Sequence, residues 1–240
     1  MEDAVDAIAQ LDISEPTEFY AVYDGHGGAE AVTFVKRRLP LVICRSRGVL
    51  GDAQQIGDAL REAFARTDEE CLQHLSSPAQ QPSRVSDSSK DRACVEDEAC
   101  TLSSGCVCCV ALLRGSVVHI ANLGDCRAVL CKDGEFVCLT ADHRPDAHEG
   151  EHARLRDLGI ELSSDGYLHG RIGVSRAFGV WAWERGAKCR GLLCCPEVCE
   201  AQITQGTEFL LLACDGIFEK MSTREAGQIV RRRLRATGGD

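Results

Sequence analysis

The stretch YAVYDGHGG, residues 20–28, places an acid, a histidine and three glycines directly after an apolar run. One interpretation is an ordinary turn, because Asp-Gly pairs are common in turns. The other is that Asp24 stands at the end of a strand in order to bind a ligand, while the glycines keep the space around it open. A single Asp-Gly pair does not distinguish the two.

Other acids repeat this placement. Asp215 and Gly216 follow the apolar run FLLLAC, Asp125 follows ANLG, and Glu2 and Asp3 stand near the start of the chain. Clustered carboxylates repel one another unless a cation lies between them, and oxygen ligands suit Mg²⁺ or Mn²⁺. The pattern therefore favours a site for hard divalent cations.

Composition restricts the class of protein. The chain has 240 residues, 44% hydrophobic and 27% charged, with a formal net charge of −10, which is typical of a globular protein. An acidic chain is a poor general ligand for nucleic acid or for an anionic membrane. The basic run at 231–235 is expected to be a solvated helix face. We expect one domain over residues 1–240 and no membrane span, because the apolar runs are too short.

Fifteen cysteines, an odd number, accompany an acidic N-terminus that lacks the features of a secretion signal. We therefore expect reduced thiols and an intracellular protein, in the cytoplasm, the nucleus or both. Several cysteines lie in apolar runs and can act as small hydrophobic residues: Cys106, Cys108, Cys109 and Cys214. A zinc-binding module is an alternative, on Cys189, Cys194, Cys195 and Cys199, although they lack a pair of C-x-x-C knuckles.

Four stretches have the periodicity or the caps of helices. They are residues 29–40, ended by Pro40; residues 52–75, capped by Asp52; residues 146–158, with Asp146 and Glu149 as a capping box and Gly159 at the end; and the stretch after Ser222, with Ser222 and Glu225 as a capping box. Residues 76–98 are polar and aperiodic, which predicts a mobile loop insertion.

Short apolar runs predict the strands. CVCCVALL, SVVHIAN, CRAVLC and EFVCL are separated by turns of a few residues, among them Asp133-Gly134. Strands joined so closely must be antiparallel, so we expect a meander. Two more strands are expected around 197–203 and 208–214. Helices beside an antiparallel sheet indicate an α+β fold.

In its ordered motifs the chain resembles the metal-dependent protein serine/threonine phosphatases, the protein phosphatase 2C family. The matching stretches, which cover almost the whole chain, are MED (1–3), YAVYDGHGG (20–28), SSGCVCC (103–109), ANLGDCRAVL (121–130), LTADHRPD (139–146), GRIGVSRAFG (170–179) and LLLACDGIFEKMS (210–222). The resemblance implies two packed antiparallel sheets flanked by helices, a four-layer αββα sandwich.

The resemblance also implies a site with two Mg²⁺ or Mn²⁺ ions. It assigns Asp24 to both ions, the Gly25 carbonyl and Glu2 to one, and Asp215 to the other. Asp3 lies behind these direct ligands, and Asp125 and Glu219 match positions tied to a third, weaker ion, with Glu219 where Asp is usual. His26 is the implied general acid for the leaving alkoxide, and His143 is interpreted as structural.

The implied activity is hydrolysis of phosphoserine and phosphothreonine in phosphorylated protein substrates, with residues 144–170 as a flap that sets substrate choice. No residue pattern specifies an oligomeric state. An alternative is a pseudophosphatase that binds phosphoproteins without turnover. Retention of Glu2, Asp24, His26 and Asp215 favours the enzyme.

Some family features have no counterpart in residues 1–240. These are a first strand with an Arg that helps hold the phosphate and a late Asp-Asn motif that supplies a further ligand, while Val107 and Val180 replace a usual Thr and Asp. We expect a fold incomplete at both ends, as in a fragment of a longer phosphatase or in a degenerate member, and weak Mn²⁺ binding by the isolated chain.

Overall fold

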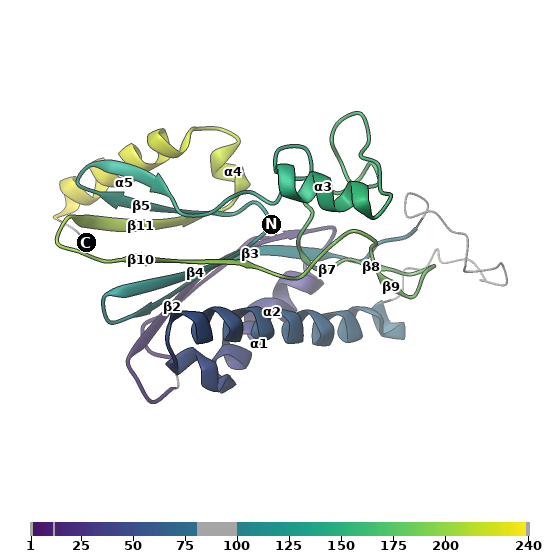
Figure 1. Ribbon diagram of the computed structural model, residues 1–240, viewed down its shortest axis with the longest axis horizontal. Helices are drawn as coiled ribbons and strands as arrows, with labels where there is room; N and C mark the ends of the chain where they lie inside the picture. Colours follow the sequence, from purple (N-terminus) through teal and green to yellow (C-terminus); the bar gives the residue numbers. More distant parts are fainter. Residues whose placement is uncertain (1, 12, 81–99, 239–240) are drawn as a thin grey trace.

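The computed structural model describes residues 2–11, 13–80 and 100–238, and it contains two antiparallel β-sheets packed face to face (Figure 1). The larger sheet has the strand order β1-β2-β3-β4-β10, and the short β7 pairs with β3. Its strands are β1 (Ala4–Ile8), β2 (Thr17–His26), β3 (Gly105–Arg114), β4 (Val117–Leu123), β7 (Phe178–Gly179) and β10 (Glu197–Gln202).

The second sheet has the order β11-β5-β6. Its strands are β5 (Arg127–Lys132), β6 (Glu135–Cys138) and β11 (Thr207–Ala213), and a separate two-stranded ribbon consists of β8 (Trp181–Ala182) and β9 (Ala187–Lys188). Between β5 and β6, Asp133 and Gly134 have φ values of 51° and 83°. Positive φ at both turn residues is the conformation of a tight hairpin, as the Asp-Gly pair predicts.

Helices cover the outer faces of both sheets (Figure 1). The larger sheet is covered by α1 (Glu30–Arg45) and α2 (Ala53–Leu75), the second sheet by α4 (Asp215–Phe218) and α5 (Thr223–Thr237), and α3 (Glu149–Asp157) lies beyond the end of the second sheet. Short 3₁₀ turns occur at Arg47–Leu50 and Pro78–Gln80. The four layers confirm the predicted α+β sandwich.

Two apolar clusters hold these layers together. The first lies between α1, α2 and the larger sheet, where Phe64 stacks on Phe178 at 5.2 Å between ring centroids. The second fills the space between the sheets and includes Val107 and Cys109. The first eight residues of β3 are all buried, because β3 lies between the two clusters and is covered on both faces.

The four short strands do not form one continuous meander. β3 pairs with β4 and β5 with β6, but β4 next pairs with β10, whereas β5 pairs with β11 in the other sheet. The chain crosses between the sheets at Gly124, which has a φ of 102°. A Cβ there would also collide with the side chain of Val107. The crossing places Asp125, the next residue, between the two sheets.

Two predicted ends of elements are wrong. β2 does not stop at Asp24 but continues to His26, because β3 offers it pairing partners as far as Gly105. The helix at 29–40 does not stop at Pro40, which lies inside α1. Proline removes one backbone donor from the helix. Pro40 is nevertheless buried, and Leu39, Val42 and Ile43 on either side of it belong to the first cluster, so this packing carries the helix on to Arg45.

The caps of the longer helices agree with the sequence. The Asp52 carboxylate accepts from Gln55 N at 2.9 Å, and Ser222 and Glu225 form the predicted capping box. At α3 the prediction of Asp146 as the cap is wrong. The cap is His148, whose Nδ1 accepts from Glu151 N at 3.3 Å, because the chain first makes a turn at Arg144.

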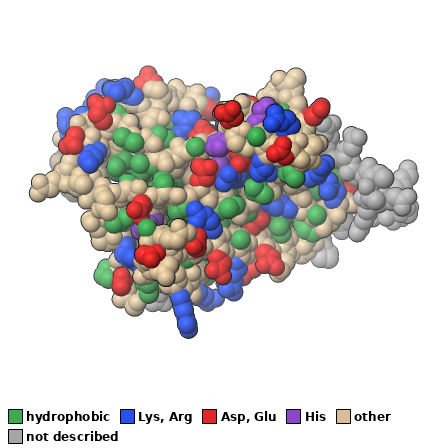
Figure 2. All heavy atoms as spheres, viewed as in Figure 1, with side chains coloured by type: hydrophobic (Ala, Val, Ile, Leu, Met, Phe, Trp, Pro, Cys, Tyr) green, Lys and Arg blue, Asp and Glu red, His purple; other side chains and the backbone are tan. Residues whose placement is uncertain are grey.

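The predicted loop at 76–98 lies mainly outside the described residues, which include only its first part, 76–80. Across the described chain, no helix combines the length and the apolar character that a membrane span requires. Figure 2 shows acidic and basic side chains interspersed over the visible face rather than gathered into separate fields. The basic run of α5 is partly paired, since Arg231 forms two hydrogen bonds with Glu208.

Candidate metal centre

Asp24 lies on β2 directly opposite Val107 of β3. Side chains alternate along a strand, so Asp24 shares its face with Tyr20 and Val22, which pack against the cluster between the sheets. The carboxylate therefore faces the space between the two sheets, and it is half-buried.

Asp215 approaches from the second sheet. It follows β11 and is the first residue of α4, with Cys214 as the N-cap. One ligand atom from each of Asp24, Cys214 and Asp215 lies within 4.8 Å of the other two. Two carboxylates 191 positions apart in the chain are thus brought to one point by the packing of the sheets.

Burial and neighbouring charges raise the pKa of two of these acids, Asp24 and Asp125. Burial, followed by the charges of Asp215 and Asp3, raises the pKa of Asp24 to about 7. Burial and the charge of Asp215 raise the pKa of Asp125 to about 6, although Arg144, with its Nη1 3.6 Å from Asp125 Oδ2, acts in the opposite direction. Desolvated carboxylates held together at this cost are typical of a cation site.

Glu2 and Asp3 adjoin this group. A Cβ on Gly25 would come within 2.8 Å of the Glu2 carbonyl oxygen, so only glycine lets the two chains approach this closely. The Asp3 carboxylate acts on Asp24, and that of Glu2 acts on His26. The structure therefore brings Glu2, Asp3, Gly25 and Asp125 to the region of Asp24 and Asp215.

Glu219 is placed differently. Its N–H donates to the Asp215 carbonyl at 2.7 Å, but its side chain is exposed and its carboxylate lies 3.8 Å from Lys220 Nζ. Among the described residues it is not part of the group that could hold a metal ion.

His26 is packed rather than open. Burial lowers the pKa of its imidazole, and the nearby Glu2 carboxylate opposes that shift. Its Nε2 is buried and has no hydrogen-bond partner among the described residues. A Cβ on Gly105 would collide with both His26 Nε2 and Val180, so the glycine makes room for the ring. Val180 has a φ of 60°, a strained conformation for a β-branched residue.

His143 has a structural role, as predicted. It is fully buried, and its Nδ1 accepts from Gly124 N at 3.0 Å, which fixes the crossing before Asp125. The sequence reasoning did not single out Arg144, although its position in LTADHRPD, next to His143, was a usable signal. It also treated Cys214 only as a hydrophobic residue, whereas the structure places that thiol beside two carboxylates.

The donor set fits a hard divalent cation. It consists of carboxylate oxygens with the Gly25 carbonyl nearby, which suits Mg²⁺ or Mn²⁺. Burial raises the pKa of the Cys214 thiol, so its protonated form is a weak ligand. The predicted zinc quartet does not converge in this way within the described chain. Cys106, Cys108, Cys109 and Cys214 are free thiols.

Comparison with known proteins decides the family. The family model described as protein phosphatase 2C matches residues 1–239. The chain belongs to the protein phosphatase 2C family. A probable protein phosphatase 2C of Oryza sativa subsp. japonica is 35% identical over 223 residues, which cover 92% of this chain and 53% of the relative. A probable protein phosphatase 2C of Paramecium tetraurelia is 32% identical over 98% of this chain and 73% of its own length.

Solved structures agree with the fold. A Caenorhabditis elegans structure described as a sex determining protein matches with a TM-score of 0.76 at 23% identity, over 95% of this chain and 52% of that one. Serine-threonine phosphatase 2C from Toxoplasma gondii matches with a TM-score of 0.70 at 19% identity, over 98% and 84%. Both confirm the predicted phosphatase 2C architecture. The chain spans little more than half the length of the first plant relatives it matches.

Proposed function

We propose that this protein hydrolyses phosphoserine and phosphothreonine in phosphorylated proteins and that it requires Mg²⁺ or Mn²⁺. The main support is the meeting of Asp24 and Asp215, from different sheets, within 4.8 Å. Burial and the charge of Asp215 raise the pKa of Asp24 to about 7, so the ionised Asp24 is costly to keep beside Asp215 without a cation. Membership of the family adds the phosphatase chemistry.

In this proposal Asp24 serves both ions, the Gly25 carbonyl and Glu2 serve one, and Asp215 serves the other. Asp3 lies behind these direct ligands and stabilises their arrangement. Asp125 is a ligand of a third ion, which binds more weakly than the other two. Glu219 would need to turn inward to join that third site, because its carboxylate now faces solvent.

When bound, the two ions would supply an activated water and would neutralise phosphate charge. The protein's own residues hold the carboxylates at a fixed separation and provide a proton for the leaving alkoxide. His26 is the candidate donor, because it lies two positions beyond Asp24 and its buried Nε2 has no partner among the described residues. Since burial lowers its pKa, that role requires bound substrate or the Glu2 carboxylate to favour the protonated ring.

The first test is metal-dependent hydrolysis of a phosphothreonine peptide by the full-length protein. We expect turnover with Mn²⁺, none with EDTA, and a loss of at least about 100-fold for Asp24→Asn. Asp58→Asn, an exposed acid of α2, is the matched control and should leave turnover unchanged. Undiminished activity in EDTA would contradict the proposal. Tight phosphopeptide binding without turnover would identify a pseudophosphatase instead.

The role of His26 needs a second substrate. A general acid contributes about 10²–10⁴ in rate, and most when the leaving group is poor. His26→Ala should therefore slow hydrolysis of the phosphothreonine peptide much more than that of p-nitrophenyl phosphate, whose phenolate leaves easily. Equal losses on the two substrates would assign His26 to packing rather than to proton transfer.

A further inference from the structure

Asp215 is carried by the least buried helix at the site. The four residues of α4 include none that is buried, and Ile217 is 41% exposed. Its few backbone hydrogen bonds, such as Glu219 N to Asp215 O at 2.7 Å, lie within the turn itself. A turn this short and exposed cannot hold a carboxylate in position by its own packing. Some contact from outside the turn is needed.

Arg127 supplies such a contact. Its guanidinium carbon lies 4.8 Å from the centre of the Phe218 ring, the last residue of α4. Arg127 is the first residue of β5 and pairs directly with Ala213 of β11, two positions before Asp215. The arginine therefore reaches across the base of the turn from a neighbouring strand and covers its far end.

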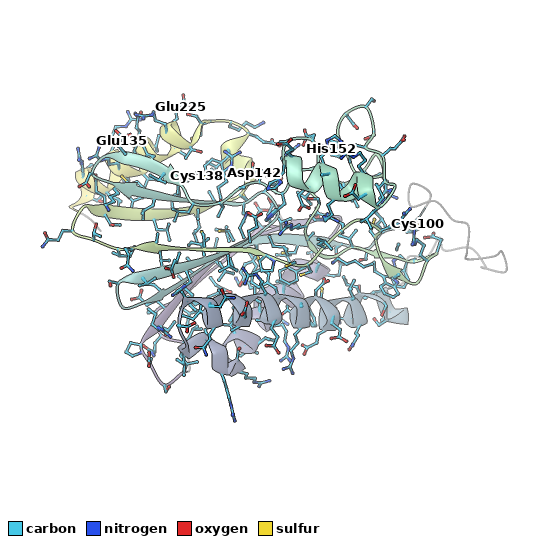
Figure 3. All side chains as sticks on the ribbon, viewed as in Figure 1. Cys100, Glu135, Cys138, Asp142, His152 and Glu225 are labelled. Atoms are coloured by element: carbon cyan, nitrogen blue, oxygen red, sulfur yellow. The ribbon has the colours of Figure 1, made fainter. Side chains whose placement is uncertain are left out.

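The guanidinium is itself fixed in place. Arg127 Nε donates to Asp142 Oδ1 at 2.8 Å, and its Nη2 donates to Asp142 Oδ2 at 2.6 Å. This two-point pairing sets the plane of the guanidinium, which a single contact would not do. Asp142 lies beyond the end of β6 (Figure 3), next to His143, which anchors the crossing before Asp125. The same residues thus connect α4 with the Asp125 segment.

We propose that Arg127, oriented by Asp142 and stacked on Phe218, is a positioning residue that keeps Asp215 within ligand distance of Asp24. This inference rests on the proposed function insofar as Asp215 is a metal ligand. Among the described residues, the hydrogen bonds of Arg127 go to Asp142 and not to the acids of the group, although the charges of Arg127 and Asp125 interact. Arg127 acts through Phe218, by restricting the turn on which Asp215 stands.

The test compares two bidentate arginine pairs. Arg127→Met removes the proposed clamp. Arg231→Met removes the Arg231–Glu208 pair, which has hydrogen bonds of 2.6 and 2.7 Å and similar side-chain exposure but joins α5 to β11 and does not stack on Phe218. Mn²⁺ binding is measured by calorimetry, and amide hydrogen exchange is measured in EDTA. We expect Arg127→Met to weaken Mn²⁺ binding at least tenfold and to speed exchange of the amides of residues 217–221. Arg231→Met should do neither.

Phe218 provides variants that leave the ion pair intact. Phe218→Leu should weaken Mn²⁺ binding about as much as Arg127→Met, and the double variant should add little to either, because both remove one contact. Phe218→Trp keeps an aromatic face for the guanidinium and should stay within threefold of wild type. This rescue separates positioning from general loss of stability, which thermal unfolding of each variant in EDTA also reports.

Wild-type Mn²⁺ binding by Arg127→Met would overturn the proposal, as would an equal loss in Arg231→Met. If the unaltered protein bound no Mn²⁺, the proposed function would fail and so would the link to a metal. The exchange measurement would still decide the clamp by itself. Faster exchange at 217–221 in Arg127→Met would support it, and unchanged exchange would overturn it.

Discussion

The larger sheet carries Asp24 and the second sheet leads into Asp215, and the two sheets are packed very differently. On the larger sheet, β3 is buried along most of its length, and α1 and α2 each bury at least seven residues. On the second sheet, β11 is mainly half-buried, α5 buries only Ala226 and Gly227, and α4 buries none. Asp24 thus stands on a rigid strand and Asp215 on an exposed turn.

This difference indicates how the protein can hold two carboxylates close together and still be stable. Two carboxylates can be held close together only if at least one of them lies on a well-packed element. The apolar cluster beneath β2 provides this packing for Asp24. The helix α4, which carries Asp215, is then the part that can move, so the distance between Asp24 and Asp215 depends on contacts local to α4. Cation binding is expected to order the second sheet more than the larger one, because β11, α4 and α5 are much less buried than β3, α1 and α2.

The largest expected effect comes from a substitution in the cluster between the larger sheet and its helices, the better packed of the two regions. Phe64→Ala removes a fully buried ring that stacks on Phe178 and should lower the free energy of unfolding by about 3–5 kcal/mol. Phe209→Ala, the same change on half-buried β11, should cost only about 1–2 kcal/mol. Urea unfolding of both variants measures the difference, and equal losses would remove the contrast between the sheets.

The second effect is the pH dependence of stability that arises from Asp24, which lies between the two sheets. Because folding raises the pKa of Asp24 from 3.8 to about 7, the folded metal-free protein binds its proton more readily than the unfolded chain. The free energy of unfolding should therefore fall as the pH rises through this range. Asp24→Asn should flatten that dependence.

At pH 8 in EDTA, Asp24→Asn should be more stable than wild type by on the order of 1 kcal/mol, a figure reduced for solvent screening of a half-buried group. Urea unfolding in EDTA from pH 5 to pH 8 provides the measurement. Adding Mn²⁺ should stabilise wild type and leave Asp24→Asn nearly unchanged. A variant less stable than wild type at pH 8 would mean that Asp24 contributes to folding rather than opposing it.

The smallest effect compares two matched caps. Asp52 and Ser222 each begin a helix with a capping box, one over each sheet. Asp52→Ala should lower global stability by about 1 kcal/mol, because α2 buries one face along its length and is expected to unfold together with the larger sheet. Ser222→Ala should instead speed amide exchange in α5 and change global stability by less than about 0.5 kcal/mol. A large global loss from Ser222→Ala would show that α5 is as tightly coupled as α2.

Much of the fold could be predicted because its signals are local. The Asp133-Gly134 turn, the Asp52 cap and the Ser222–Glu225 box depend on residues within a few positions of one another, and each forms as predicted. The ordered motifs likewise identified the family. The helix end at Pro40 was predicted wrongly because packing in the first cluster outweighed the local preference. The start of α3 was predicted wrongly for a local reason, because the chain makes a turn at Arg144 before His148 caps the helix.

The candidate site likewise has features that could be predicted from the sequence and features that could not. Which acids are available, and that glycine must accompany Asp24, could be predicted from the amino-acid sequence, since these are properties of residue types and their neighbours in the chain. Three features became visible only in the folded chain: the separation of β4 and β5 at Gly124, the meeting of Asp215 with Asp24 while Glu219 faces solvent, and the stacking of Arg127 on Phe218. The physical reason is that each of these depends on how two separately formed sheets pack, and no periodicity or spacing along one segment encodes the distance to another.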